Sequence, residues 1–302
     1  MAVFPQDDLM QARLFHLHAL SALHCGTGQS TGVVDLPIAR ARATQLPIVP
    51  GSSLRGVLRQ SVSEHNESAA RALFGPKSIA DNAKSFAGAL AVGDAHLLAL
   101  PVRALAGIVC YVTAPFILSR YARDLERAGL TAPEPLSPAP ANNTALVAAD
   151  SVNRMENKLV LEDLDLDVSD NDIAKQWAED IAQLIHPQDV MAQTDFRQRF
   201  AILPDNILGF LSETATELRT RISIDENTGT VKKGALWFEE HLPAETLLWG
   251  IYALTDSNEP DQPYARDALA RALPASDTLL QIGGQAGVGR GLVRFLTQEG
   301  LA

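Results

Sequence analysis

The chain has 302 residues, of which 46% are hydrophobic and 20% are charged. This composition is typical of a globular protein and excludes a disordered or fibrous one. No run of residues approaches the ~18 uncharged apolar positions of a membrane span, and the opening MAVFPQDDLM lacks the regions of a signal peptide. Two cysteines, Cys25 and Cys110, are too few for a disulfide framework. We therefore expect a soluble cytoplasmic protein with no membrane partner.

The formal net charge is −11, but the acids are concentrated in one segment. Residues 156–180 hold nine acids against two lysines, whereas residues 36–63 and 281–298 hold arginines and no acid. These arginines are Arg40, Arg42, Arg55, Arg59, Arg290 and Arg294. The net charge argues against a nucleic-acid binder, yet two basic segments can attract a polyanion because salt screens charges beyond ~8 Å. Simple solvation of arginine-bearing loops is the alternative.

Hydrophobic patterning predicts strands and helices in alternation through the first part of the chain. Residues 12–23 alternate loosely, which predicts a strand. Ser52 is a candidate N-cap for a helix whose apolar positions recur at helical spacing. Residues 87–103 predict a strand pair or one bent strand, residues 107–113 predict another strand, and residues 115–128 predict a helix.

The rest of the chain begins with four prolines in residues 131–140, which must form an exposed loop. The pattern then predicts a strand over 159–168, helices over 172–185 and 205–219, a hairpin over 221–243 that turns at 227–229, a strand over 245–254, and a strand, a glycine-rich loop and a strand over 279–295. Strands separated by helices, with hairpins between them, favour an α+β fold of ferredoxin-like type with insertions.

Two segments are candidate anion sites. In the glycine-rich loop, Gly287 and Gly289 leave backbone amides open beside Arg290, although the spacing fits neither a dinucleotide-binding nor a P-loop motif. The helix start combines the hydroxyls of Ser52 and Ser53 with free amides. A tight turn and a plain cap are the respective alternatives. Two basic sites in an acidic chain favour a phosphodiester backbone over one small anion.

Asp35 is the candidate acid for chemistry, because it stands alone among arginines and follows a glycine-containing loop that begins at His24. A carboxylate beside phosphates can hold a divalent metal or align a ribose 2′-hydroxyl for attack. Glu239, Glu240 and His241 end a predicted strand and can supply a second acid and a base. Solvated glutamates at a strand end are the simpler interpretation of that pair.

Two further patterns are interpreted as structural. His16 and His18 alternate along an apolar strand, which favours a place in the core over metal binding. The acidic segment is not an EF-hand, because Asp170 and Gln176 stand where the loop needs glycine and glutamate. A solvated, charged edge is expected there.

Six segments together resemble one family. They are HCGTGQSTGVVDLPI (24–38), IVPGSSLRGVLR (48–59), LFGP (73–76), LPVRALAGIVCYVTAPFIL (100–118), GALWFEEHLP (234–243) and QIGGQAGVGRGLVRF (281–295). They are similar in content and order to the RAMP-superfamily backbone subunit of type III-B CRISPR effectors, the repeated, RNA-cleaving subunit of the Cmr complex. The resemblance implies a single domain over 1–302, with a variable inserted region over 131–200.

The resemblance also implies a modified RRM-like ferredoxin fold, likened to a hand with palm, fingers and thumb. Copies of such subunits stack along a guide CRISPR RNA as a filament, together with other Cmr subunits, and cut paired single-stranded target RNA at regular intervals with Mg²⁺ or Mn²⁺. The family's key acid and metal ligand matches Asp35, its loop histidine matches His24 and its strand glutamate matches Glu239. His241 stands where the family has tyrosine. With the basic segments included, the expected RNA-binding residues are Arg40, Arg42, Ser52, Ser53, Arg55, Arg59, Gly287, Gly289 and Arg290.

These expectations combine into one mechanism. A thumb hairpin unstacks a target nucleotide, so that its 2′-hydroxyl attacks the adjacent phosphate and leaves a 2′,3′-cyclic phosphate and a 5′-hydroxyl. Asp35 positions a metal or takes up the proton. A catalytically silent scaffold that only coats guide RNA is one alternative. Metal-free processing of precursor guide RNA through His24 is the other.

Overall fold

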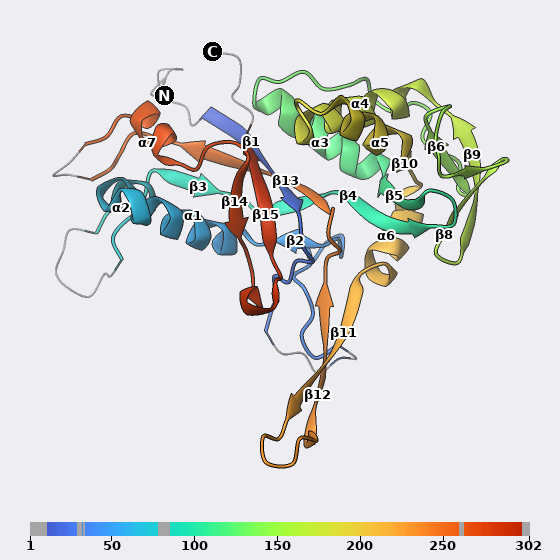
Figure 1. Ribbon diagram of the computed structural model, residues 1–302. Helices are drawn as coiled ribbons and strands as arrows, with labels where there is room; N and C mark the ends of the chain where they lie inside the picture. The colour runs from blue at the N-terminus through green and yellow to red at the C-terminus, as the bar shows by residue number, and fades with distance from the viewer. Residues whose placement is uncertain (1–10, 29–31, 33, 78–84, 260–262, 298–302) are drawn as a thin grey trace.

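The computed structural model describes residues 11–28, 32, 34–77, 85–259 and 263–297. Most of its strands join one large sheet, and a separate hairpin projects from it (Figure 1). In spatial order the sheet contains β14 (Thr278–Gln281), β15 (Leu292–Thr297), β1 (Gln11–Ala19), β13 (Leu247–Leu254), β4 (Ala95–Ala104), β5 (Ile108–Thr113), β10 (Phe200–Ile202), β6 (Thr144–Val147), β9 (Leu164–Asp170), β8 (Lys158–Leu161) and β7 (Arg154–Met155). Two short strands, β2 (Ile48–Val49) and β3 (Leu90–Val92), pair with β4 and β13.

The centre of the sheet has the order β15-β1-β13-β4, and each neighbouring pair is antiparallel. Helix α1 (Gly51–His65) lies in the chain between β1 and β4, and α7 (Arg266–Ala272) lies between β13 and β15. The strand predicted over 12–23 is confirmed as β1, where Leu14, Phe15 and Leu17 are buried. A short helix, α2 (Glu67–Phe74), follows α1 and contacts α7.

The far part of the sheet curls into a ring. Pairing runs from β4 through β5, β10, β6, β9 and β8, and the pairing of Ala104 with Leu161 joins β8 back to β4. Helices α3 (Pro115–Arg127), α4 (Asp172–Ile185) and α5 (Val190–Gln198) lie beside this ring on the upper side in Figure 1. The predicted helices over 115–128 and 172–185 are confirmed, since their apolar faces supply buried residues such as Leu118 and Trp177.

Three predicted elements differ from the structure. The strand over 159–168 is two strands, because the chain turns at Glu162, which has a positive φ of 48°. The helix over 205–219 ends at Thr214 as α6 (Asp205–Thr214), and the next residues form a strand. Helix α1 begins one residue before Ser52, and its N-cap is Pro50, whose φ of −59° already suits a helix entry. Ser52 is therefore not the cap.

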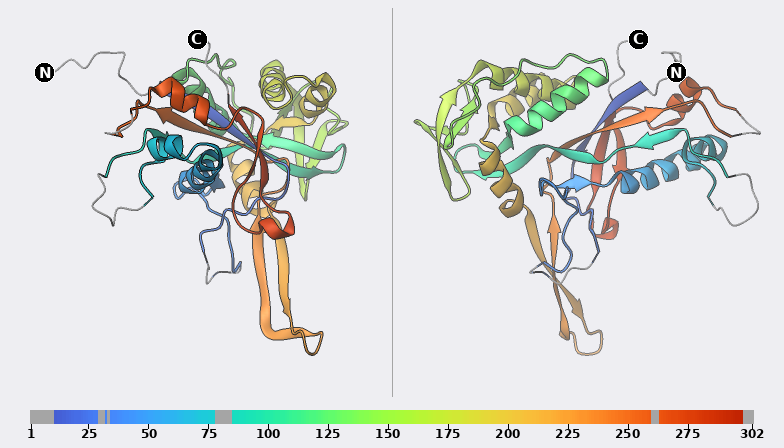
Figure 2. Two further views of the ribbon diagram at one scale, coloured as in Figure 1. Left: turned by 60° about the vertical axis from the view of Figure 1, so that its left-hand side comes forward. Right: turned by 180° about the vertical axis from the view of Figure 1, so that it is seen from behind.

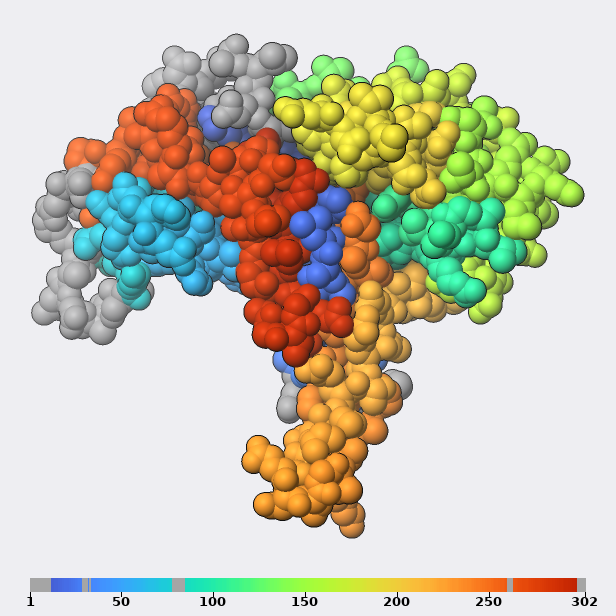
Figure 3. All heavy atoms as spheres, in the orientation of Figure 1, coloured from blue at the N-terminus to red at the C-terminus, as the bar shows by residue number. Residues whose placement is uncertain are grey.

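The predicted hairpin is confirmed as β11 (Glu217–Ile224) and β12 (Val231–His241). It projects away from the body of the molecule, as Figure 2 shows from two further directions and Figure 3 shows as an orange protrusion. Its root joins the body through main-chain pairing of β12 with the loop that follows β1. Nowhere in the described ranges is there a helix with the length and hydrophobicity that crossing a membrane requires.

Candidate functional site

Asp35 lies where the loop after β1 meets the root of the hairpin. Its Oδ2 accepts a hydrogen bond from the backbone nitrogen of Phe238 at 2.8 Å. On either side of that contact the backbone of Leu36 pairs with β12, since its nitrogen donates to Phe238 and its carbonyl accepts from Glu240. The carboxylate is half-buried, so it is fixed by the hairpin and still open to solvent.

His24 is buried beside the same strand end, and its tautomer is set by a backbone contact. Its Nδ1 lies 2.7 Å from the carbonyl oxygen of Glu240, which can only accept, so Nδ1 carries the proton. Nε2 is therefore the ring nitrogen that faces away from the Glu240 carbonyl. A Cβ at Gly26 would lie only 2.6 Å from Nε2, so the glycine makes room for the ring.

His241 is fully buried and faces His24, with ring centroids 5.3 Å apart. Its Nε2 is 3.3 Å from Oε1 of Gln285, and its Nδ1 has no hydrogen-bond partner within the described ranges. Burial lowers the pKa of His241 below its ordinary value, and the nearby charge of Arg290 acts in the same direction. His241 is therefore neutral at physiological pH and bridges the strand to the glycine-rich loop.

The two glutamates of the strand end are buried, which corrects the simpler interpretation of a solvated pair. Oε1 of Glu239 accepts from the indole nitrogen of Trp237 at 2.7 Å, and its Oε2 lies 3.6 Å from Arg221. Glu240 pairs with Arg40 at 2.5 Å and also accepts from the backbone nitrogen of Ile38. Glu240 is thus a structural anchor between the loop and the hairpin.

The glycine-rich loop packs against His24 through its backbone. Gly283 has a φ of 80°, and a Cβ there would lie 2.2 Å from the carbonyl oxygen of His24. Gly284 donates to the same carbonyl at 2.9 Å. Gly287 lies in the short 3-10 turn η2 (Ala286–Val288), and Gly289 follows it. Both glycines are exposed and have open space where a Cβ would be. The outer part of the loop is consequently the part that a ligand can approach.

The structure separates the expected RNA-binding arginines into two groups. Arg55 and Arg59, which lie one turn apart on α1 as predicted, donate to the carbonyls of Phe74 and Gly75. Arg40 is likewise committed to Glu240 and to backbone carbonyls. The side chain of Arg42 is exposed and that of Arg290 is half-buried, and neither forms an ion pair within the described part of the chain.

The expected sites lie on one side of the molecule. Four segments lie below the sheet in Figure 1, namely the start of α1, the η2 loop, the loop after β1 and the hairpin. Both views of Figure 2 agree. At the start of α1, Ser52 is exposed and Ser53 is half-buried. The structure thus brings together four of the expected site residues at the hairpin root: Asp35, His24, Glu239 and His241. Gln285, which contacts His241, carried no sequence signal because its partner is 44 positions away in the chain, whereas Trp237 contacts Glu239 two residues along its own strand.

The residues interpreted as structural have that role. His16 is buried and hydrogen-bonds the hydroxyl of Tyr121 at 2.8 Å, while His18 contacts Glu245 at 2.7 Å. The acidic segment is a charged edge, in which Arg154 and Lys158 pair with Asp170 and Asp167. Within the described residues, no three His, Cys, Asp or Glu side chains are grouped to hold a metal ion.

Asp35 offers a carboxylate to a metal ion, and RNA phosphates or water could supply the other ligands. Oδ2 of Asp35 is engaged by Phe238, which leaves Oδ1 as the carboxylate oxygen that could bind a cation. Mg²⁺ commonly binds phosphate substrates through one or two carboxylates, with phosphate oxygens and water completing its shell. The donor set thus fits an ion shared between Asp35 and a phosphate, not one held by the chain alone.

Comparisons with known proteins agree on one family. The family model of the RAMP superfamily matches residues 16–294. The chain is 35% identical over 296 residues to the CRISPR system Cmr endoribonuclease Cmr4 of Pyrococcus furiosus, covering 96% of this chain and 97% of that protein. A crystal structure of oligomeric Cmr4 from Pyrococcus furiosus superposes with a TM-score of 0.73 and 29% identity, covering 97% of this chain and all of the other.

A more distant likeness extends the agreement in fold. A chain of the type III-B Cmr-beta complex bound to cognate target RNA superposes with a TM-score of 0.69 at 19% identity, covering 95% of this chain and 96% of that one. The expected RAMP fold with both helices and strands is confirmed, and its core is rich in strands. The chain belongs to the RAMP superfamily, as a homologue of Cmr4.

Proposed function

We propose that this chain is the backbone subunit of a type III-B Cmr effector complex. It binds a guide CRISPR RNA as a repeated subunit, beside copies of itself and other Cmr subunits, and cleaves the paired target RNA at regular intervals. The observation that carries the proposal is the half-exposed carboxylate of Asp35, held at the root of a projecting hairpin by Phe238. The full-length similarity to a protein named an endoribonuclease supports it.

The core of this subunit is a ferredoxin-like palm, and the β11–β12 hairpin is its thumb. The strand order β15-β1-β13-β4, antiparallel throughout and with a helix after β1 and after β13, supports this assignment. The hairpin protrudes from the body of the molecule (Figure 3), as insertion between nucleotides of a guide–target duplex requires. Unstacking a nucleotide there costs a few kcal/mol.

The RNA backbone follows the side of the molecule where the exposed sites gather. Ser52, the outer glycines of the η2 loop and Arg42 are exposed there, and Arg290 is half-buried. Arg55 supports the start of α1 by holding Phe74. Backbone amides at a helix start and in a glycine loop suit phosphate oxygens, and the cations add attraction.

Cleavage proceeds by attack of the target's own 2′-hydroxyl. The hydroxyl gives its proton to Asp35 as O2′ bonds to the adjacent phosphorus; the bond from phosphorus to O5′ then breaks, and O5′ takes up a proton. The products are a 2′,3′-cyclic phosphate and a 5′-hydroxyl. His24 and Glu239 lie at the same hairpin root. A bound divalent ion, Mg²⁺ or Mn²⁺, shared between Asp35 and the phosphate, would neutralise charge that develops on the phosphate.

The test uses the complex assembled on a guide RNA and a labelled complementary target. The proposal predicts evenly spaced products with Mg²⁺, none with a chelator, and none with Asp35→Ala, while that variant still assembles and binds both RNAs. A scaffold without chemistry instead protects RNA and yields no product ladder in any condition. Metal-free cutting of the guide precursor would identify guide processing. Wild-type cleavage by Asp35→Ala overturns the assignment of the acid.

A further inference from the structure

A groove runs between α4 and the loop that follows α3. It consists of two adjoining cavities of about 560 and 500 Å³, which share Thr131, Pro133 and Asp180. Helices α3 and α4 lie above the sheet in Figure 1, whereas the expected RNA sites lie below it. The groove is therefore separate from the site proposed for cleavage, and the proposed function gives it no role.

The first cavity has a mainly apolar wall. The wall includes Leu125, Leu130, Pro133, Leu184 and Leu296. Leu130 and Leu184 are only half-buried, so part of this wall is open to a ligand. Burying such a surface is favourable, and the cavity therefore suits an apolar side chain.

The same wall contains a buried hydrogen-bond donor. The indole of Trp177 is 2% exposed, and its Nε1 has no hydrogen-bond partner within the described residues. The other two tryptophans are satisfied: Trp237 donates to Glu239, and Trp249 donates to Asp124. Buried polar groups are almost always paired, so an unpaired one indicates a missing partner. An indole N–H can only donate, so a ligand must bring an acceptor, such as a peptide carbonyl.

The second cavity is acidic. Glu134, Asp172 and Asp180 line it, are exposed and form no ion pair with any described residue. Asp180 accepts a hydrogen bond from the neutral amide of Gln176, which leaves its charge uncompensated. No described lysine, arginine or histidine lines either cavity. The groove therefore repels RNA phosphates and attracts a cationic ligand.

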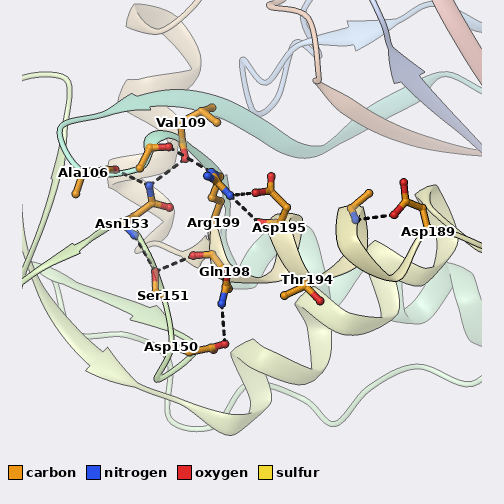
Figure 4. A network of polar contacts seen from close by, with 12 residues as sticks. Ala106, Val109, Asp150, Ser151, Asn153, Asp189, Thr194, Asp195, Gln198 and Arg199 are labelled. Atoms are coloured by element: carbon orange, nitrogen blue, oxygen red, sulfur yellow. Dashed lines mark hydrogen bonds and ion pairs between the residues drawn. The ribbon is translucent and has the colours of Figure 1, made fainter.

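The wall formed by α4 is fixed before any ligand binds. Asn171 caps α4 by accepting from the backbone nitrogen of Ala174 at 2.8 Å. Helix α4 packs on α5, and the end of α5 is tied to the neighbouring loop where Gln198 donates to Asp150 at 3.2 Å (Figure 4). In the same network, Ser151 donates to the carbonyl of Gln198. A preformed site loses less conformational entropy when it binds.

We propose that the groove binds an extended basic segment of a partner protein. In that segment an apolar side chain fills the first cavity, and a backbone carbonyl accepts from Nε1 of Trp177. Lysine or arginine two residues along pairs with Asp180 and Asp172, because alternate side chains of an extended chain point the same way. Half-buried side chains such as Leu184 change rotamer to admit the segment, as is common at interfaces. The succession of an apolar and an acidic cavity favours an extended peptide over a compact cation.

The first test is fluorescence anisotropy of the labelled peptide Arg-Ser-Arg-Ser-Leu-Ser-Arg-Ser-Arg with the full chain. This sequence presents the same side chains in either direction along the groove. We expect saturable binding that weakens as salt rises, and no binding of the matched peptide with glutamate in place of arginine. A peptide that does not bind, or a glutamate peptide that binds equally well, overturns the proposal.

Charge reversal locates the binding to the groove. Asp172→Lys with Asp180→Lys should weaken peptide binding about tenfold or more, since like charges then face the arginines. Asp163→Lys with Asp165→Lys is the matched control, because these exposed acids line neither cavity. The control changes the net charge equally and should bind within about twofold of wild type. Equal binding by the two double variants overturns the proposal.

The second test follows the indole N–H signals of the isotope-labelled chain by NMR. The peptide should shift the Trp177 signal downfield and leave the Trp249 signal, whose N–H already donates to Asp124, in place. Trp177→Phe assigns the signal, keeps an aromatic ring and should bind the peptide about fivefold more weakly. A Trp177 signal that stays in place while the peptide binds contradicts the proposed hydrogen bond.

Other occupants of the groove give different results. If a second copy fills it, raising the protein concentration without peptide moves the Trp177 signal. If the end of the chain fills it, the peptide binds only after deletion of residues 298–302, which follow Thr297 at the first cavity. Either result overturns a separate partner. Asp35→Ala should bind the peptide as wild type does, so a failure of the cleavage assignment remains distinguishable from a failure of this site.

Discussion

The carboxylate of Asp35 and the backbone nitrogen of Phe238 are joined by a hydrogen bond of 2.8 Å. This contact fastens the loop after β1 to the root of the hairpin. The strand end that carries Phe238 and the acid proposed for chemistry are therefore directly joined. If the hairpin displaces a nucleotide of the target, the same displacement places that nucleotide beside Asp35.

Replacing Gly283 tests the close packing of the glycine-rich loop on His24. Gly283→Ala places a Cβ only 2.2 Å from the His24 carbonyl oxygen, at a positive φ, so it should lower the free energy of unfolding by roughly 2 kcal/mol or more. Gly56→Ala, in open space on α1, should raise it by about 1 kcal/mol. Urea unfolding measures both. Equal stability of the two variants would show that the loop does not rest on His24.

Arg40 and Arg42 are both expected RNA ligands, but replacing each of them should change the free energy of unfolding by a different amount. Arg40→Met leaves Glu240 buried without its cation, which costs about 3 kcal/mol of unfolding free energy. Arg42→Met changes an exposed side chain and should stay within about 0.5 kcal/mol of wild type. Thermal or urea unfolding in the absence of RNA measures the stability of both variants. A stable Arg40→Met chain that only binds RNA more weakly would restore Arg40 as an RNA ligand.

His16 should make the protein less stable in acid. Burial lowers the pKa of His16 from its ordinary 6.5 to about 3, so between these values the unfolded chain binds a proton that the folded chain does not. Stability is therefore complete above pH 6.5 and falls as the pH drops toward 3, by up to about 1.4 kcal/mol per unit. His16→Gln should flatten the slope of unfolding free energy against pH in this window. An unchanged slope in His16→Gln would contradict the lowered pKa of His16.

Local patterns predicted most of the central strands and the larger helices, and the failures have physical causes. In residues 159–168 the alternation is interrupted only by the adjacent acids Glu162 and Asp163, and this short break, which was interpreted as part of one strand, is where the chain reverses. Residues 205–219 contain no proline or late glycine to end the helix, and only pairing with β12 draws the chain into β11 at Glu217. The short elements α2, α5, β6, β7 and β10 carry too few residues for a clear period.

The residues of the candidate site also divide into those that the local sequence indicates and those that depend on distant contacts. The isolated position of Asp35 among arginines predicts its role from sequence, and the family resemblance indicates His24 and Glu239. The burial of Glu240 and its pairing with Arg40 could not be foreseen, because the two residues are 200 positions apart. From sequence alone, an arginine in a basic segment is as consistent with an exposed RNA ligand as with a partner in an internal ion pair. Only its tertiary contacts distinguish the two roles.

The most direct measurement of the central claim is single-turnover cleavage of guide-paired target RNA by Asp35→Asn. Asparagine keeps an oxygen that can accept from Phe238 and removes the charge, so the hairpin root should stay intact and unfolding free energy and RNA affinity should match wild type. Cleavage should fall by ~10²-fold or more, since a general base or metal ligand is lost. Cleavage at the wild-type rate, with the same cyclic-phosphate ends, would contradict a catalytic Asp35.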